Sequence, residues 1–298
     1  MTLQQLKYAV AVSESTTVSH AAQKVFISQP SLTAALKNLE DEMNVKIFSR
    51  TNKGIEVTKE GKVFLSYARQ VLEQADLLEE RFTGRKSQKA VFSVSCQHYS
   101  FAVNAFVDVI KEFGGDKYNF TLRETQTNEI IEDVSRLVSE VGILYTDSKN
   151  EEIILKLLKK NELEWKELFT AQPHVFISDK NPLCKKEKVL LGDLKPYPYL
   201  AFEQGEHSSF YFSEEPYSYL DHEKVIMVRD RATIFNLLIG LNGFTVSSGV
   251  IDKELNGEHI VSRPLDLKEH MKIIIITKKN MNLSRYAKKY IESLKKYC

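Results

Sequence analysis

The chain has 298 residues, of which 43% are hydrophobic and 27% charged, and its 41 basic side chains nearly balance 40 acidic ones. This composition is typical of a folded globular protein and excludes gross disorder. The length predicts at least two domains. A net charge of +1 does not indicate a nucleic-acid partner by itself, so any such affinity must be local.

The three cysteines, Cys96, Cys184 and Cys298, are widely spaced and form no C-x-x-C pair. A scattered, odd-numbered set predicts neither a disulfide framework nor a zinc site, and it suits a reducing compartment. The N-terminus lacks the basic-then-apolar pattern of a signal peptide, and no stretch approaches the ~20 apolar residues of a membrane helix. We therefore expect a cytoplasmic protein that does not enter a membrane.

The first sixty residues predict three short helices, at about 3–12, 18–25 and 28–42. Hydroxyl side chains at 15–17 can cap the second helix, and Pro30 suits the first turn of the third. The buried stripe of the third helix is predicted to be Leu32, Ala35, Leu36, Leu39 and Met43.

The opposite side of this third helix carries short polar or small groups, at Gln29, Pro30, Thr33, Ala34 and Lys37. Small side chains let a helix approach base edges in a major groove, where Gln and Thr offer hydrogen bonds. A solvated helix surface is equally polar, so this face alone leaves both interpretations open.

The segment 46–58 alternates apolar and polar residues and turns at Asn52-Lys53-Gly54, which is typical of a two-stranded hairpin. Arg50 and Lys53 near its tip are placed to reach phosphates or a minor groove. A recognition helix followed by a basic hairpin is a winged helix, so the sequence predicts a DNA-binding domain at 1–58.

Residues 21–61 closely resemble the DNA-binding domain of LysR-type transcriptional regulators. The resemblance rests on Ala21-Ala22, Ser28-Gln29-Pro30-Ser31, Leu39-Glu40, Phe48-x-Arg50 and Thr58-x-x-Gly61, all in the family's order and spacing. Thr33 departs from the Ser that members commonly carry, but it keeps the hydroxyl. The resemblance implies that double-stranded promoter DNA is contacted by Gln29, Pro30, Ser31, Thr33, Ala34, Lys37, Arg50 and Lys53.

A long helix-forming stretch follows, and with the polar, basic hinge at 84–89 it makes a linker over 59–89. Its apolar residues are spaced by alternating steps of four and three, at Phe64, Ala68, Val71, Ala75, Leu78 and Phe82. This spacing is typical of a coiled coil, and a helix packed on its own chain is the alternative. LysR-type regulators dimerise through this helix, so the resemblance implies a homodimer and, in the family's usual form, a homotetramer.

From residue 90 onward, strands alternate with helices, which predicts α/β organisation. Strands are expected at 91–95, 120–124, 141–145, 168–171, 174–178, 199–202, 224–228, 244–247 and 271–277, and helices at about 103–113, 130–138 and 283–296. The resemblance implies an effector-binding regulatory domain at 90–298 with two subdomains, 90–165 plus 268–298 and 166–267, similar to periplasmic binding proteins. The predicted fold is an all-α winged helix-turn-helix and linker helix, followed by this two-subdomain α/β domain.

Ligands of α/β folds bind at the carboxyl ends of strands, and the turn at 95–100 is the first such place. A simple helix cap is the alternative there. By resemblance, the effector-binding candidates are Ser95, Cys96, Gln97, His98, Tyr99, Thr146, Phe202, Glu203, Gln204 and Ser247. Helix N-termini and hydroxyls favour an anionic or amino-acid-like small-molecule effector. Similarity to Gram-positive members suggests sulfur amino-acid metabolism.

Catalysis is a weaker interpretation of this turn. Cys96 and His98 do not form a nucleophile–base pair on one turn, and the histidines show no metal-binding spacing. We therefore expect neither an enzyme nor a cofactor. A cytoplasmic ligand-binding protein of the solute-receptor type, without regulatory DNA binding, is the alternative function, and the motif at 21–61 counts against it.

Overall fold

The computed structural model describes residues 1–13, 15, 17–51, 54–83, 90–115, 117–205, 209–251 and 257–297. The chain divides into two compact units, Met1–Gln88 and Lys89–Cys298. No helix among these described residues is long and apolar enough to cross a membrane.

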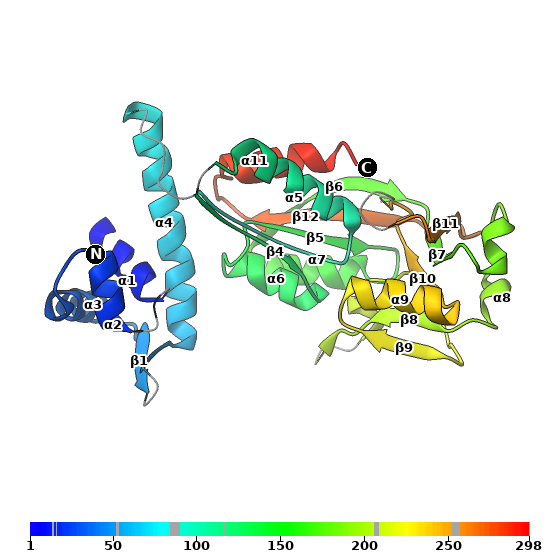
Figure 1. Cartoon of the computed structure of the whole chain (residues 1–298), viewed down its shortest axis with the longest axis horizontal. Helices are drawn as coiled ribbons and strands as arrows, with labels where there is room; N and C mark the ends of the chain where they lie inside the picture. The colour runs from blue at the N-terminus through cyan, green and yellow to red at the C-terminus, as the bar shows by residue number, and fades with distance from the viewer. Residues whose placement is uncertain are drawn as a thin grey trace. The chain divides into compact units, whose positions relative to one another are not determined.

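Three short helices open the first unit: α1 (Leu3–Ser13), α2 (Val18–Lys24) and α3 (Gln29–Met43) (Figure 1). Thr17 caps α2 by accepting a hydrogen bond from the His20 N–H, and Ser28 caps α3 by accepting one from the Ser31 N–H. The three predicted helices are confirmed.

The core of this unit forms where α3 packs on α2. Leu32, Leu36 and Leu39 are buried with the small side chains of Ala21 and Ala22, which allow close approach of the two helices. The prediction that Met43 belongs to this stripe is wrong. Met43 is exposed because α3 ends there at the left-handed Asn44, and Glu40, one turn earlier, takes the inward position.

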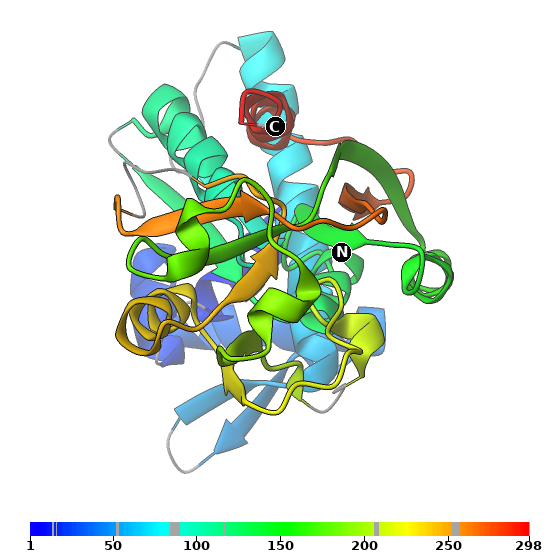
Figure 2. The same ribbon diagram turned by 90° about the vertical axis from the view of Figure 1, so that its right-hand side faces the viewer.

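A hairpin of β1 (Phe48–Thr51) and β2 (Gly54–Val57) follows, and its antiparallel pairing confirms the predicted wing. The two strands project from the helices of their own unit, as the blue arrows at the bottom of Figure 2 show. Only the backbone of Arg50 is described in β1, and Lys53 lies outside the described residues.

The linker forms a single helix, α4 (Lys59–Thr83). Its first half packs on its own unit: Ala68 is buried, and Arg69 donates a hydrogen bond to Ser13 of α1. The second half turns its apolar residues to solvent, with Leu78 61% and Phe82 80% exposed. The first half therefore packs on its own chain, and the coiled-coil interpretation of the second half stays a prediction. The predicted hinge lies outside the described residues.

The second unit has two lobes. The first lobe contains a five-stranded sheet in the order β4-β3-β5-β12-β6, with β3 parallel to β4 and β5, and β12 antiparallel to β5 and β6. Its strands are β3 (Ala90–Cys96), β4 (Tyr118–Glu124), β5 (Val141–Thr146), β6 (Leu163–Ala171) and β12 (Met271–Lys278), and its helices are α5 (Ser100–Phe113), α6 (Thr127–Ser135), α7 (Glu151–Lys160) and α11 (Arg285–Leu294). Because strand side chains alternate between faces, α5 and α11 bury one face and α6 and α7 the other.

The second lobe faces the viewer in Figure 2. It has an antiparallel sheet in the order β10-β7-β11 and a parallel pair, β8-β9. Its elements are β7 (His174–Ser178), β8 (Tyr199–Phe202), β9 (Val225–Val228), β10 (Thr245–Ser247), β11 (Ile260–Pro264), α8 (Leu191–Leu194), α9 (Arg231–Leu241) and short 3-10 turns at Pro182–Lys185 and Phe210–Phe212. The chain passes between the lobes twice, from β6 to β7 and from β11 to β12.

Some predicted boundaries in this unit are wrong. The helix expected to reach residue 138 ends at Ser135, because Leu137 adopts a left-handed backbone with φ of 60°. Strand β6 begins five residues earlier than expected, at Leu163. Helices α7, α8 and α9 and strand β11 were not predicted.

Candidate nucleic-acid interface and ligand cleft

The outer side of α3 is the candidate nucleic-acid interface. Gln29, Pro30, Ser31, Ala34 and Lys37 are exposed there, and Thr33 is half-buried. Two contacts hold the start of this face: the Ser19 hydroxyl donates to Gln29 Oε1 at 2.8 Å, and the hydroxyls of Ser28 and Ser31 lie 2.7 Å apart. The structure therefore brings the six predicted α3 residues together on one accessible surface.

Glu40 joins this helix to the wing. Its Oε1 accepts hydrogen bonds from the backbone N–H groups of Ile47 at 2.7 Å and Phe48 at 3.0 Å, and its Oε2 accepts one from Lys46 at 2.8 Å. Burial opposes ionisation of this carboxyl, but the hydrogen bonds and the Lys46 charge outweigh it, so the pKa of Glu40 is lowered. The carboxylate thereby fixes where the hairpin leaves the recognition helix.

The start of α4 is fixed to the segment directly before β1. The Thr58 hydroxyl donates to the Lys46 carbonyl at 2.5 Å and accepts from the Gly61 N–H at 2.8 Å. A Cβ on Gly61 would lie 2.0 Å from the Ile47 carbonyl oxygen, so only glycine fits at this approach. These contacts explain the Thr58-x-x-Gly61 motif as a joint between wing and linker.

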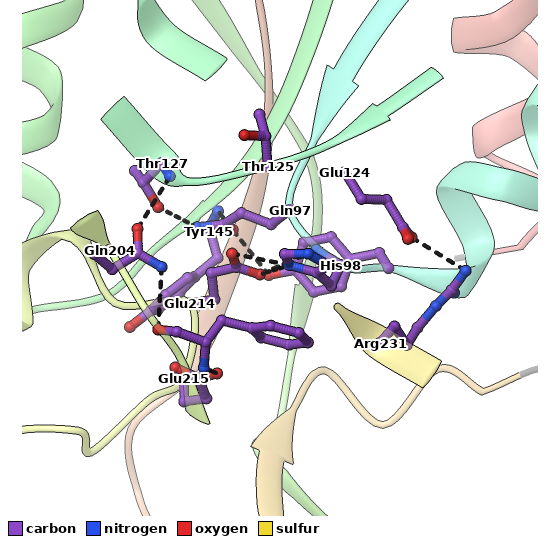
Figure 3. Close-up of polar contacts among 12 residues, drawn as sticks. Gln97, His98, Glu124, Thr125, Thr127, Tyr145, Gln204, Glu214, Glu215 and Arg231 are labelled. Atoms are coloured by element: carbon purple, nitrogen blue, oxygen red, sulfur yellow. Dashed lines mark hydrogen bonds and ion pairs between the residues drawn. The ribbon is translucent and has the colours of Figure 1, made fainter. Parts of the chain in front are cut away.

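In the second unit, a hydrogen-bond network ties the lobes together at the end of β3 (Figure 3). Gln97 Nε2 donates to Thr127 Oγ1 at 2.7 Å, and Gln97 Oε1 accepts from the Tyr145 N–H at 2.8 Å. Thr127 in turn donates its hydroxyl proton to the Phe212 carbonyl and its backbone N–H to Gln204 Oε1. Because Phe212 and Gln204 belong to the second lobe, this buried network sets the distance between the lobes.

His98 lies beside this network, and its contacts also join the first lobe to the second. Its ring stacks on Phe202 with centroids 3.8 Å apart, and Glu214 lies 2.9 Å from Nδ1. The Glu214 carboxylate also accepts the His98 backbone N–H at 3.0 Å. Burial favours the neutral imidazole, but the charges of Glu214 and Glu124 outweigh this effect and raise the pKa of His98.

Two hollows lie around His98, which lines both of them. The inner one is small, about 30 Å³, and is lined by His98, Tyr99, Phe202, Glu214, Arg231 and Ser247 among others. The outer cleft is about 530 Å³ and is lined mainly by the start of α6 and by Glu124, Glu203 and Arg229. Arg231 Nη2 lies 3.1 Å from Glu124 Oε1, so an ion pair also crosses between the lobes here.

The charge of the outer cleft differs from the expectation of an anion site. Glu124, Glu129, Glu132 and Glu203 line it, together with the cation Arg229, which pairs with Glu203. A hydroxyl and a helix N-terminus, the kinds of group expected to favour an anion, are present at Thr125 and α6, but carboxylates outnumber them. The cleft is therefore acidic, with one basic side chain and one helix start.

The structure separates the ten predicted effector residues. His98, Tyr99, Phe202 and Ser247 line the inner hollow, and Glu203 lines the outer cleft. Gln97 and Gln204 belong to the network behind them.

The other three lie away from the cleft. Ser95 donates to Asp133 at 2.6 Å and contacts Ser139, Cys96 is buried in the apolar core, and buried Thr146 ends β5. They do not line the hollows because they face the interior of the first lobe.

Several residues of the cleft were missed from the sequence. Glu214 is 116 positions from His98 and carries no local pattern. Arg231 was missed together with α9, although Asp230 has the position of a helix cap and accepts from the Thr233 N–H at 2.8 Å. The Asp-x-x-Thr start was the signal available for this helix.

Comparison with known proteins agrees with this architecture. Residues 3–62 match the family of bacterial regulatory helix-turn-helix proteins described as the lysR family. The chain is 25% identical over 306 residues to the uncharacterized HTH-type transcriptional regulator YvbU of Bacillus subtilis, covering 99% of this chain and 98% of that protein. It is 25% identical over 255 residues to the HTH-type transcriptional regulator AlsR of Bacillus subtilis, covering 84% of this chain and 78% of that protein.

The fold is also similar to a solved structure, a full-length OxyR variant from Pseudomonas aeruginosa. The TM-score is 0.65 at 19% identity, covering 99% of this chain and 98% of that one. Both sequence relatives are named as transcriptional regulators, and neither is named as an enzyme. Residues 3–62 therefore form a helix-turn-helix domain of the lysR family, and the chain is similar over nearly its whole length to a bacterial HTH-type transcriptional regulator.

Proposed function

We propose that this regulator contacts double-stranded promoter DNA with the outer face of α3 and with the basic wing. The exposed row on α3 supports this assignment, because its small side chains permit close approach and Lys37 adds a cation at its end. On α3 the contacts are Gln29, Pro30, Ser31, Thr33, Ala34 and Lys37, and on the wing Arg50 and Lys53. The DNA-binding domain then comprises 1–58, and the regulator acts in the cytoplasm, where bacterial DNA lies.

The regulatory signal is an amino-acid-like molecule bound in the cleft between the two lobes. The observation that carries this proposal is the outer cleft of about 530 Å³, which both lobes line beside His98. A molecule held there contacts both lobes at once, so its binding favours one arrangement of the lobes over another. The ordered contacts of His98 with Glu214 and Phe202 give the cleft a fixed wall.

The charges of the cleft favour a zwitterion. Glu129 and Glu132 provide oxygens for an ammonium group, and Arg229 together with the N-terminal end of α6 suits a carboxylate. A simple organic anion would face an excess of carboxylates in the same cleft. An α-amino acid carries both an ammonium group and a carboxylate, so it can pair with both kinds of charge in the cleft. Sulfur-containing amino acids belong in the first screen.

A screen on the full chain tests this assignment. Each amino acid is compared in a thermal-shift measurement with the matching amine and the matching 2-oxo acid. At about 100 times Kd, a ligand stabilises the folded state by about 2.7 kcal/mol, which raises the Tm of a unit of this size by about 5–10 °C. One amino acid should give this shift, and its one-charge analogues should give much less.

Two variants connect the shift to the cleft. His98→Ala and Glu129→Gln should each reduce the response, whereas Glu152→Gln, an exposed carboxylate on α7, should leave it unchanged. A response that persists in both cleft variants, or no response to any amino acid, would refute the proposed cleft ligand.

The second half of α4 supports homodimerisation. Val71, Leu78 and Phe82 are exposed there in the spacing of a coiled coil, and three exposed apolar side chains on one helix indicate a partner surface. The family's tetramer is then a dimer of such dimers. Paired DNA-binding domains would meet operator half-sites about one or more helical turns apart.

A further inference from the structure

A second cavity lies wholly within the second lobe. It encloses about 350 Å³ between α8, the start of β8, the segment 216–224 and β10. We call it the lobe-two cavity. Of its lining residues, only Val246 also lines the inner hollow beside His98. It is therefore a site of its own rather than part of the cleft between the lobes.

The walls of the lobe-two cavity are largely apolar and aromatic. Leu194, Tyr199 and Phe244 are buried residues of the lobe's hydrophobic core, and Leu191 and Leu220 complete the wall. The Tyr199 ring packs on His222 with centroids 4.1 Å apart and on Phe244 at 5.4 Å. Charged residues lie only at the exposed rim, and they are of both signs.

Two polar atoms in this wall have no hydrogen-bond partner among the described residues, the hydroxyl of Tyr199 and Nε2 of His222, whereas the Tyr217 hydroxyl interacts with the Glu269 carboxylate. Tyr199 is only 3% exposed and Tyr217 only 8%. Buried polar groups in folded proteins are nearly always paired with protein, water or ligand. Two such groups around one cavity indicate an occupant that offers hydrogen bonds.

The side chains of Tyr199, Tyr217 and His222 are all electrically neutral near pH 7. Burial raises the pKa of the Tyr199 phenol and, with the nearby Glu269 carboxylate, that of Tyr217. Burial also lowers the pKa of His222. The cavity thus offers two phenolic hydroxyls and one uncharged imidazole, but no buried ion to pair with a charged ligand.

We propose that the lobe-two cavity binds a small, uncharged aromatic molecule that carries a hydroxyl group. The apolar walls and stacked rings suit an aromatic ring, and the unpartnered Tyr199 and His222 atoms suit a group that both donates and accepts. A carboxylate would lose its hydration without gaining a counter-ion.

The position of this site connects it to the cleft. Glu214 and Glu215 line the inner hollow, and the next two residues, Pro216 and Tyr217, line the lobe-two cavity. Tyr217 holds the left-handed φ of 66° at this point. An occupant therefore contacts the same four-residue segment that fixes His98, and it can change the response of the cleft without entering it.

Calorimetric titration of the full chain with phenol tests the site, with benzoate as the charged comparison. A phenol Kd in roughly the millimolar range is expected for so small a ligand, and benzoate should bind more weakly. Tyr199→Phe and Tyr217→Phe each remove one hydroxyl and should weaken phenol binding, the former by about tenfold. Tyr118→Phe, at an exposed tyrosine of β4, is the matched control.

His98→Ala separates this site from the proposed cleft ligand. It should leave phenol binding intact while it reduces the amino-acid response. Absence of saturable phenol binding, tighter binding of benzoate, or a phenol affinity of Tyr199→Phe equal to that of the unaltered chain would overturn the proposal. None of these results bears on the cleft ligand.

Discussion

His98 and Glu214, 116 residues apart, form a two-point contact between the lobes: the carboxylate accepts the His98 backbone N–H at 3.0 Å and lies 2.9 Å from Nδ1. Both side chains are nearly fully buried. The contact is strongest when the imidazole is protonated, because an ion pair then adds to the hydrogen bonds.

Stability of the second unit should consequently depend on pH through His98. Its pKa is raised in the folded state, so its stabilising effect is complete below the unfolded value of about 6.5 and is lost as pH rises through the raised folded value. Urea unfolding followed by Trp165 fluorescence should show a lower free energy of unfolding on the alkaline side of this window. His98→Gln should flatten that decline, and the exposed His270→Gln should not. An equal slope in all three proteins would contradict the assignment.

Replacement of Glu40 should destabilise the first unit selectively. Glu40→Ala leaves the N–H groups of Ile47 and Phe48 without their acceptor, which should cost about 2–3 kcal/mol of unfolding free energy. The loss should appear in far-ultraviolet circular dichroism without a shift of the Trp165 midpoint, because Trp165 lies in the second unit. The exposed neighbour Asp41→Ala should change stability by less than about 0.5 kcal/mol. Equal stability of the two variants would mean that Glu40 does not support the wing.

Two Gly→Ala substitutions, both within helices, should have opposite effects. Gly61→Ala places a methyl group against the Ile47 carbonyl and should cost about 2 kcal/mol. In α9, a Cβ on Gly240 meets no atom within 4 Å, so Gly240→Ala should stabilise its unit by about 0.5–1 kcal/mol through helix propensity. Denaturant unfolding of the two variants measures the sign of each change in the free energy of unfolding. A stabilising Gly61→Ala would show that the joint between wing and linker is not tight.

The first unit was predictable because its determinants are local. Caps at Thr17 and Ser28, the stripe through Leu32 and Leu39, and the hairpin turn all lie within a few residues of the structure that they specify. The sequence indicated Glu40 only as part of the Leu39-Glu40 motif. Its function depends on Ile47 and Phe48, which the hairpin returns to the end of α3.

The cleft was less predictable because its residues come from distant segments. Helix α9 has apolar residues on most sides, so it lacks the periodicity that distinguishes a surface helix from a buried strand. Without α9, Arg231 had no assigned position. Ser95 and Gln97 were both expected at the ligand. Instead, Ser95 in β3 donates to Asp133, and Gln97, directly after β3, donates to Thr127, which no local pattern reveals.

Dimerisation should depend on the exposed half of α4. Replacing both Leu78 and Phe82 with Glu removes two apolar side chains and adds like charges, so the dimer Kd should rise at least about 100-fold. Gln74→Glu adds charge at an exposed polar position of the same helix and should have little effect. Sedimentation velocity over a range of concentrations measures the difference. A double variant that remains a dimer at low concentration would place the interface elsewhere.

DNA binding through the outer face of α3 is tested most directly by the affinity of the full chain for its own upstream promoter fragment. Fluorescence anisotropy at fixed moderate salt should show Lys37→Ala binding about tenfold more weakly than the unaltered chain. Lys111→Ala, which removes an equally exposed cation from α5 of the second unit, should bind with unchanged affinity. Equal loss in both variants, or no loss in Lys37→Ala while its helical circular dichroism is intact, would contradict recognition by this face.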